Sequence, residues 1–474
     1  MGKLNSYYRP SVLVLSLVAL MAIFSWHTPN SLLTTASVMA LPIYASLLWV
    51  RGEPPVLFFI IVHQWLEVTL EVFYANVSKL PIEELAGIPE VGKAVMLGLA
   101  ALLALALGMR LAMSRLRVFE GVKMREEVTH FSSHRLWTAY LVAFPTSLLL
   151  AQVAYKFPSF TQPLLGFSYF KWLIFFLLAF TVLQTRKRRA YLVSAVVLET
   201  ILGFTGYFSK FTYVFFLLII VSVTVGYRMN VRNFLRLTAV GTLLLLLTCA
   251  WMSVKMEYRS YVNLGGGQQK VLVPFKERAI KMIGLLSSLD RKVLKEGLGL
   301  LVGRIAYIDY FAHVLHMVPQ VVPHENGRLW EGVLKHIFMP RVFFPSKPVL
   351  ASDSLITMKY TGLWVAGEEE GTSISIGYVA ESYIDFGSRG MFIPIFILGL
   401  LSGFLYRYLT TSTQVKIFGY AAATVTLIDV IHFGSTNTKL VGGLLISFIT
   451  MALALKFLTP PLHNWLIARQ KLVR

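Results

Sequence analysis

The segment KAVMLGLAALLALALGMRLAM, residues 93–113, decides the fold class of this chain. Its length is close to the roughly 20 apolar residues that an α-helix needs to cross the hydrocarbon core of a bilayer. Similar runs recur along the 474 residues, which are 56% hydrophobic and only 14% charged, whereas soluble domains carry about 25% charged residues. Because a helix satisfies its own backbone hydrogen bonds in lipid, the sequence predicts an all-α polytopic membrane protein.

The apolar runs predict about twelve transmembrane helices. The first run follows MGKLNSYYRP and resembles a signal peptide, but no small-x-small cleavage site follows it cleanly, so we interpret it as a retained first helix. The single cysteine, Cys249, lies inside a run, so the sequence offers no disulfide framework and no zinc spacing. The runs lie at 11–26, 31–50, 56–75, 93–113, 136–156, 164–184, 190–207, 211–227, 237–254, 391–406, 417–433 and 440–458.

The basic residues predict the orientation of these helices. The chain has a net charge of +20, and about half of its 44 Lys and Arg residues fall on one side when the helices alternate. The positive-inside rule places that side, with both termini, in the cytoplasm, for a bacterial inner membrane. The excess charge is therefore mainly a topology signal, and we do not expect nucleic acid as a partner. The basic stretches are the N-terminus, Arg51, 110–135, 185–190, 227–236, Arg407 to Lys416 and the tail.

One long segment breaks the alternation. Residues 255–390 lie between the ninth and tenth spans on the outer side, and they keep apolar stretches such as GLGLLVGRIAYIDYFAHVL. We expect short amphipathic or re-entrant helices lying on the membrane, and we expect function to reside here. The predicted organisation is thus 1–254 with nine spans, 255–390 as the outer catalytic segment, and 391–474 with three spans and a basic tail.

The stretch FMPRVFFPSKP, residues 338–348, fixes two cations in a stiff, aromatic segment. Proline restricts its own φ and its neighbour's geometry, so Arg341 and Lys347 project from a rigid turn near the membrane surface. An arginine fork grips phosphate oxygens and lysine acts as a point charge, as a clamp for a lipid-linked diphosphate requires. The alternative is snorkelling to ordinary lipid headgroups. Further cations upstream that can contribute are Arg259, Arg278, Lys281, Arg291 and Arg304.

The stretch SISIGYVAESYIDFGSRGMF, residues 373–392, enters the tenth span. Its acids, Glu381 and Asp385, lie near a helix N-terminus, where carboxylates are stabilised by the helix dipole, so a capping role is one reading. The other is a general base or a hydrogen-bonding contact for a sugar hydroxyl, with Tyr378 and Tyr383 as a platform for the ring.

The run GRIAYIDYFAHVLHMV places Asp309, His313 and His316 on one helix face. This set fits a polar interfacial face, a histidine base at His313, or a loose metal site. No Asp-x-Asp motif occurs in the sequence, which argues against a metal-assisted lipid-phosphate sugar transfer. We therefore predict no metal and no cofactor.

Ionisable residues also occur within the predicted spans. His63, Glu67 and Glu71 repeat every fourth position of the third span. Intramembrane ionisable groups usually face a bundle interior or a wet cavity, so they predict a hydrophilic pocket opening outward. The alternative is structural pairing, for example of Glu67 or Glu71 with Lys171. The other members are Glu199, Asp429 and His432.

PRVFFPSKP, followed by SISIGYVAESYIDFGSRG entering a helix, resembles the O-antigen and exopolysaccharide repeat-unit polymerases of the Wzy type, over about residues 338–392. The resemblance implies a metal-independent transferase with a GT-C-like membrane fold. It would move a growing glycan from undecaprenyl diphosphate onto a fresh lipid-linked repeat unit outside the inner membrane. By motif position, Arg341 and Lys347 would contact the diphosphate, and Glu381 and Tyr383 would line the site. Arg304 and His313 match no motif and rest on the physical argument.

The expected partners are donor and acceptor lipid-linked oligosaccharides and membrane lipids, with a chain-length regulator and a flippase as further candidates. Two other functions stay open. An O-antigen ligase, or another lipid-diphosphate glycosyltransferase, would use the same chemistry on a different acceptor. A secondary transporter would agree with twelve spans and the polar face of the third, although no matching halves are visible in the sequence.

Overall fold

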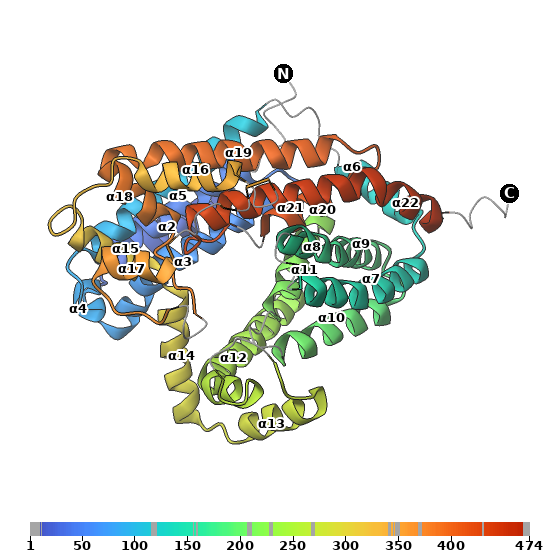
Figure 1. Cartoon of the computed structure of the whole chain (residues 1–474), viewed down its shortest axis with the longest axis horizontal. Helices are drawn as coiled ribbons and strands as arrows, with labels where there is room; N and C mark the ends of the chain where they lie inside the picture. The colour runs from blue at the N-terminus through green and yellow to red at the C-terminus, as the bar shows by residue number, and fades with distance from the viewer. Residues whose placement is uncertain are drawn as a thin grey trace.

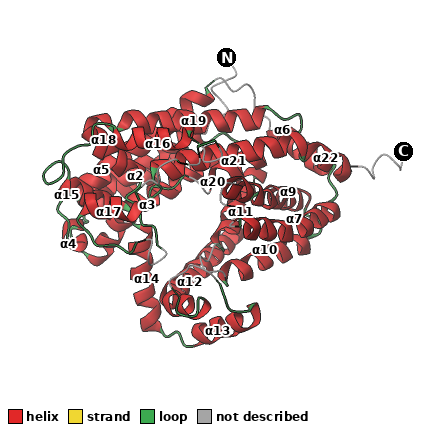
Figure 2. Cartoon of the chain, in the orientation of Figure 1, coloured by secondary structure: helices red, strands yellow, loops and turns green. Residues whose placement is uncertain are grey.

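The computed structural model describes residues 10, 12–114, 121–154, 156–157, 160–205, 211–226, 231–266, 271–339, 343–344, 346, 351–367, 372–428 and 431–467. The structure is 79% helix, and no strand occurs in these described residues (Figure 2). The expected all-α class is therefore confirmed. Each of the twelve apolar runs is helical over most of its described residues.

Seven membrane-spanning candidates stand out among the described helices by length and apolar composition. They are α2 (Ser31–Leu48), α3 (Val56–Ser78), α5 (Val91–Met113), α7 (Ser133–Ala154), the consecutive α8 (Thr161–Ser168) and α9 (Phe170–Thr185), α19 (Phe392–Thr411) and α21 (Asn437–Phe457). The remaining runs form helices that are shorter or more polar: α1 (Val12–Ser25), α10 (Arg189–Phe204), α11 (Thr212–Val225), α12 (Val231–Val262) and α20 (Lys416–Ile428).

Large apolar side chains on these helices are exposed at the molecular surface. Phe24, Leu32 and Val142 are each more than half exposed, and they lie on α1, α2 and α7. Side chains of this kind are favourable against lipid tails and unfavourable against water. The surface therefore agrees with a protein embedded in a membrane through several helices.

The tightest helix pair in the core is α5 with α19, and glycines make its close approach possible. A Cβ on Gly108 would collide with the carbonyl oxygen of Phe396, and a Cβ on Gly399 with that of Leu105. Gly403, one turn further along α19, abuts Met109 in the same way. Small residues four apart allow helix backbones to meet in a membrane, where dispersion contacts replace the hydrophobic effect as the driving force.

The segment between the ninth and tenth apolar runs consists of short helices, as expected. They are α13 (Phe275–Ser287), α14 (Arg291–Ile305), α15 (Ile308–Met317), α16 (Arg328–Phe338), α17 (Asp353–Thr361) and α18 (Tyr378–Gly390). The expected domain boundary at 254/255 lies inside a continuous helix, because α12 extends to Val262. α14 packs along α12 and reaches α3, whereas α15 packs on α5 and α17.

Polar contacts at opposite ends of the long helices join segments that are far apart in the sequence. At one end, Glu127 of α6 (Gly121–Thr129) accepts hydrogen bonds from the N–H groups that begin α20. At the other, Glu90 pairs with His316 of α15. Figure 1 shows α4 (Ile82–Ala86), α15 and α17 at one end of α19 and α21, and α6 and α22 (Thr459–Ile467) at the opposite end.

Candidate functional site

The polar face of α3 is covered by two segments from distant parts of the chain. One oxygen of the Glu67 carboxylate accepts a hydrogen bond of 2.9 Å from the backbone N–H of Phe433. The backbone carbonyl of the same residue accepts one of 3.0 Å from the N–H of Tyr307. One turn further, the carboxyl group of Glu71 lies beside that of Asp309. The face that the sequence singled out therefore lies under the α14–α15 turn and the α20–α21 connection.

The α20–α21 connection is irregular backbone held inside the protein. Its described residues run from Ile431 to Thr436, and Ile431, Phe433 and Thr436 are all buried. Gly434 lies against the ring of Tyr307, where a Cβ would come within 2.7 Å of the aromatic carbons. In membrane proteins, non-helical backbone at such depth is tolerated where protein or a polar cavity surrounds it, and it frequently marks a binding site.

Tyr307 links the α20–α21 connection to the segment that leads into α18. Its hydroxyl donates a hydrogen bond of 2.5 Å to the carbonyl of Ser375, and the hydroxyl of Ser375 in turn donates to the carbonyl of Gly434. Arg304, at the end of α14, is close enough for its charge to act on the Tyr307 phenol. A guanidinium, a phenol and the carboxylates of α3 thus lie around one junction.

Three cations gather where α12 and α14 pack together, and we refer to Lys255, Arg259 and Arg304 as the cation cluster. Lys255 is half-buried, and burial lowers its pKa, with the positive charges of Arg304 and Arg259 lowering it further. Among the described residues, the charges that shift the pKa of this amine are therefore both positive. Holding like charges together costs electrostatic free energy, which an anionic ligand placed between them would offset.

Sequence reasoning found two members of this cluster and missed the third. Arg259 and Arg304 were candidates for diphosphate contacts, whereas Lys255 was not. A signal was present, because Lys255 and Arg259 are four residues apart and so share one face of α12. The charge pattern of α12 alone does not show that α14 brings Arg304 to the same face.

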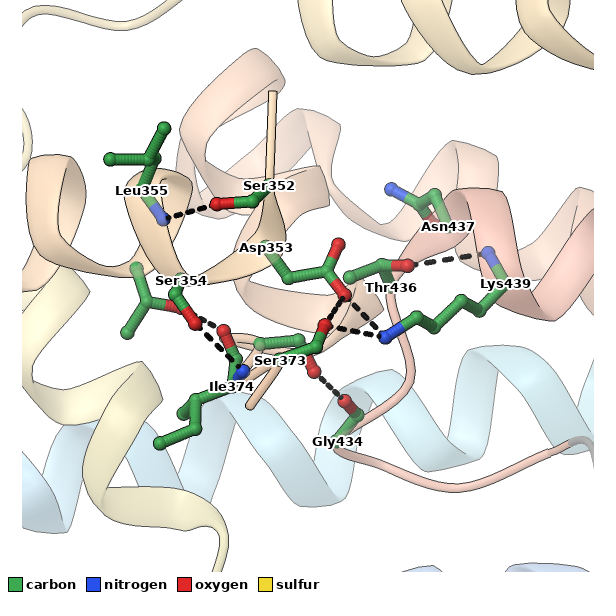
Figure 3. A network of polar contacts seen from close by, with 12 residues as sticks. Ser352, Asp353, Ser354, Leu355, Ser373, Ile374, Gly434, Thr436, Asn437 and Lys439 are labelled. Carbon is green, nitrogen blue, oxygen red and sulfur yellow. Dashed lines mark hydrogen bonds and ion pairs between the residues drawn. The ribbon is translucent and has the colours of Figure 1, made fainter. Parts of the chain in front are cut away.

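A second polar network joins α17, the segment that leads into α18, and α21 (Figure 3). Asp353 and Lys439 form an ion pair, and the hydroxyl of Ser373 bonds to both, at 2.7 Å from the carboxylate and 3.0 Å from the amine. Next to it, the carboxylate of Glu381 accepts a hydrogen bond of 2.8 Å from the N–H of Asn437, in the first turn of α21. Burial raises the pKa of Glu381 to about 8, although this hydrogen bond acts in the opposite direction.

A family model for a domain of unknown function, DUF8712, matches residues 74–462. This chain belongs to the DUF8712 family. The matched region contains the cation cluster, the network around Asp353 and Glu381, and the α20–α21 connection, whereas His63, Glu67 and Glu71 precede it. No curated protein and no solved structure matches the chain.

The aromatic and acidic candidates of α18 are all buried in this family member, together with the whole stretch 375–385. The Tyr378 hydroxyl donates to Gln64 at 2.8 Å, and the Tyr383 hydroxyl donates to the carbonyl of Val318 at 3.0 Å. Both phenols are thus engaged within the protein. Access of a sugar to them requires a rearrangement of α18 or its neighbours.

Asp385 has the capping role that was one reading of the sequence, but on a different helix. Its two carboxylate oxygens accept hydrogen bonds of 3.1 and 2.8 Å from the N–H groups of Leu329 and Trp330, in the first turn of α16. Burial raises the pKa of Asp385, and these bonds oppose that shift because they favour the charged form.

The three polar residues of α15 have separate partners. The carboxyl group of Asp309 lies beside that of Glu71, and His316 lies 3.0 Å from a carboxylate oxygen of Glu90. His313 is half-buried; burial lowers its pKa, and the nearby negative charge of Asp309 opposes the shift. The loose metal site considered for this helix is therefore not assembled, and His313 remains near the carboxylate of Asp309.

The remaining predicted cations are dispersed or lie outside the described residues. Arg278 of α13 donates a hydrogen bond of 3.2 Å to the carbonyl of Thr205 and stacks over Phe275. Lys281 pairs with Glu257. The two cations of the proline-rich stretch, Arg341 and Lys347, lie outside the described residues, as do Arg291's side chain and Asp429.

The charged groups expected inside the spans include one buried pair. The amine of Lys171 on α9 lies 2.9 Å from the carboxylate of Glu199 on α10, and Tyr140 donates a hydrogen bond of 2.9 Å to the other oxygen of Glu199. Pairing of Lys171 was anticipated, but its expected partners on α3 were wrong. The sequence does not show which helix packs beside α9.

A cavity of about 860 Å³ lies elsewhere, between α19, α21 and α22, at the end of the molecule that holds α6. Its walls are mostly apolar and include Phe404, Tyr408, Phe448 and His463. None of the residues of the cation cluster or of the α3 face lines this cavity, so it is separate from both.

Proposed function

We propose that this protein is a membrane glycosyltransferase whose donor is a glycan on a lipid diphosphate, and that it polymerises lipid-linked oligosaccharide repeat units. The observation that carries the proposal is the cation cluster. Three positive side chains converge at the junction of α12 and α14, beside Tyr307 and the acidic face of α3. A diphosphate carries charge opposite to that of the cluster, and it is a good leaving group once its charge is neutralised.

In the proposed architecture, the seven candidate spans belong to a set of twelve transmembrane helices in a GT-C-like arrangement. Both termini then lie in the cytoplasm of a bacterium, and α13 to α18 lie on the outer face of its inner membrane. In this arrangement two members of the cation cluster, Lys255 and Arg259, follow directly after the apolar run 237–254, at the depth of lipid headgroups. A lipid-linked diphosphate reaches that depth with its isoprenoid chain still in the bilayer.

The reaction divides its tasks among this chain's own residues. An acceptor sugar hydroxyl bonds to the anomeric carbon of the donor, the bond from that carbon to the diphosphate oxygen breaks, and the diphosphate leaves with the electron pair. Lys255, Arg259 and Arg304 stabilise the charge that develops on the leaving group. The transfer step itself needs no metal ion, because these cations neutralise the diphosphate.

The hydroxyl proton requires a base, and two candidates differ in access. His313 is half-buried, has a lowered pKa and is on the same helix as Tyr310, whose phenol is acted on by the charge of Arg304. Glu381 has a pKa near neutrality but is fully enclosed and bonded to the start of α21. We assign the proton transfer to His313 and the positioning of α21 to Glu381. Arg341 and Lys347 are proposed as further diphosphate contacts from the motif resemblance.

Chain elongation in cells tests the proposal. In a strain that depends on this protein for its surface polysaccharide, Arg304→Ala is expected to abolish long chains while the protein still inserts and accumulates. Lys281→Ala removes a cation of the same segment that is already paired with Glu257, and it should leave chain length unchanged. Arg341→Ala should behave like Arg304→Ala. Wild-type chain lengths in both Arg304→Ala and Arg341→Ala would contradict the clamp.

The acceptor distinguishes a polymerase from a ligase, which performs the same chemistry. A deletion strain that carries single repeat units on its core lipid indicates a polymerase, because ligation persists without elongation. Long chains that remain unattached to core lipid indicate a ligase.

A secondary transporter is a second candidate, favoured by one observation. The helical structure is interrupted between α20 and α21. The backbone N–H of Phe433, in this interruption, donates a hydrogen bond to the buried carboxylate of Glu67. Interrupted helices with intramembrane carboxylates are typical of proton- or ion-coupled transporters. Proton-dependent uptake in vesicles that is abolished by Glu67→Gln would favour this function over transfer.

A further inference from the structure

A histidine pair and a carboxylate meet where α3 touches the α20–α21 connection. His63 and Glu67 are four residues apart on α3, and His432 approaches them from the connection. One ligand atom from each of the three residues lies within 4.8 Å of the others. The Nδ1 of His63 is 3.5 Å from an oxygen of Glu67, and the two imidazole rings meet edge to face with centroids 5.1 Å apart.

The separation of His63 and Glu67 fits a bound ion better than it fits a direct hydrogen bond. In a tetrahedral site with bonds of about 2.0–2.1 Å, neighbouring ligand atoms are about 3.3 Å apart. The 3.5 Å between His63 and Glu67 is close to that value. The Nδ1 of His63 is buried and makes no hydrogen bond, although it faces a carboxylate. A buried acceptor beside an anionic oxygen is unfavourable unless a proton or a cation lies between them.

The surroundings supply two further features of metal sites. The backbone N–H of Phe433 bonds to the carboxylate of Glu67 and fixes its orientation, as second-layer donors do around metal-binding carboxylates. The His63 side chain is 29% exposed, whereas that of Glu67 is 11% exposed. The group is therefore not fully enclosed by the protein.

We propose that His63, Glu67 and His432 bind a divalent transition-metal ion, with zinc as the ion that the donor set fits best. Two imidazoles and one carboxylate suit zinc, whereas magnesium and calcium prefer oxygen ligands throughout. The ion ties the α20–α21 connection to α3 and thereby holds the start of α21 in place. This role is separate from the proposed transfer reaction, and the two are tested by different readouts.

Metal content of the purified protein tests the proposal. The full chain, carrying a tag without histidines, is purified in detergent, incubated with zinc chloride, desalted and measured by inductively coupled plasma mass spectrometry. We expect about one zinc per chain in the wild type and a loss of most of it in His63→Ala and His432→Ala. His316→Ala is the matched control, since it removes a histidine that pairs with Glu90 outside the group, and it should retain the wild-type amount. No retained zinc in the wild type, or equal retention in His63→Ala, would overturn the proposal.

A measurement on the unaltered protein guards against variants that fold poorly. Cobalt(II) bound to two imidazoles and a carboxylate gives visible absorption bands, which zinc should displace when added in equal amount. Absence of these bands from cobalt-treated wild type would contradict the site. Glu67→Gln retains an acceptor for the Phe433 N–H but loses the anionic ligand, so its cobalt bands should be weakened at the same cobalt concentration. A Glu67→Gln spectrum equal to that of the wild type would exclude Glu67 as a ligand.

Discussion

The carbonyl oxygen of Glu67 accepts a hydrogen bond of 3.0 Å from the backbone N–H of Tyr307, so the middle of α3 is joined directly to the start of α15. The bond places the acidic face of α3 beside the α14–α15 turn. Arg304 is in the last turn of α14, immediately before this turn. Carboxylates of α3 and cations of α12 and α14 are thereby brought to one place. The proposed site thus combines the cation cluster with this junction.

The pKa of the Lys255 amine is predicted to be lower than its ordinary value and to depend on the positive charge of Arg304. Because removing a neighbouring positive charge favours the protonated amine, Arg304→Ala should raise the pKa of Lys255. The measurement is the pH dependence of labelling of Lys255 by an amine-selective reagent, followed by peptide mass spectrometry. Lys359 is the internal control, since its bonds to Glu325 and Tyr360 raise its pKa. An unchanged pH profile for Lys255 in Arg304→Ala would show that the two charges do not interact.

Removing one charge of the buried pair Lys171–Glu199 is predicted to destabilise the protein more than removing both charges. Lys171→Met leaves the Glu199 carboxylate buried without its cation and should lower stability by about 3–5 kcal/mol. The double variant Lys171→Met with Glu199→Gln removes both charges and should recover most of that loss. Thermal unfolding in detergent measures both. If the double variant is as unstable as the sum of the single variants, the pair is not coupled.

Glu381 is predicted to make stability depend on pH. Its pKa is about 8 in the folded protein against an ordinary 4.5, so the folded state holds the proton more tightly than the unfolded state. The stabilisation by protonation is complete below pH 4.5, is lost as pH rises from 4.5 to about 8, and is absent above that. Glu381→Gln should therefore show a flatter dependence of the unfolding midpoint on pH than the wild type over this window. Parallel profiles for the two proteins would mean that Glu381 titrates normally.

Asp385 is predicted to stabilise α16 from outside that helix. Asp385→Ala removes two hydrogen bonds to the first turn of α16 and should cost about 2 kcal/mol. Glu331→Ala, an exposed position on the same helix, should leave the unfolding midpoint unchanged. Hydrogen exchange of α16 locates the effect, and exchange that is equally fast in both variants would argue against the cap.

The spans could be predicted from sequence because the constraint on them is local. A run such as 93–113 needs only length and apolar composition to be recognised, and both are visible in one stretch of chain. The short helices of the outer segment were anticipated for the same reason. The extension of α12 to Val262 was not, because the helix continues past the end of its apolar run with polar residues such as Lys255 and Arg259.

The partners of charged residues could not be predicted, because they depend on which helices pack together. The sequence marked Lys171 as buried but not its pairing with Glu199, which requires α9 and α10 to be neighbours. It marked the carboxylates of α18 but not their enclosure, which results from α15, α16 and α19 packing around that helix. Arg304 was selected on charge alone, and its place beside Lys255 follows from the packing of α14 on α12.

Elongation by purified protein tests the central claim most directly. The protein is reconstituted in detergent with undecaprenyl-diphosphate-linked repeat units, and the products are resolved as a ladder on a gel. The account predicts a ladder with the wild type and with Lys281→Ala, and single repeat units with Arg304→Ala and Lys255→Ala. A ladder of wild-type length from both cluster variants would contradict the assignment of the lipid diphosphate to the cation cluster.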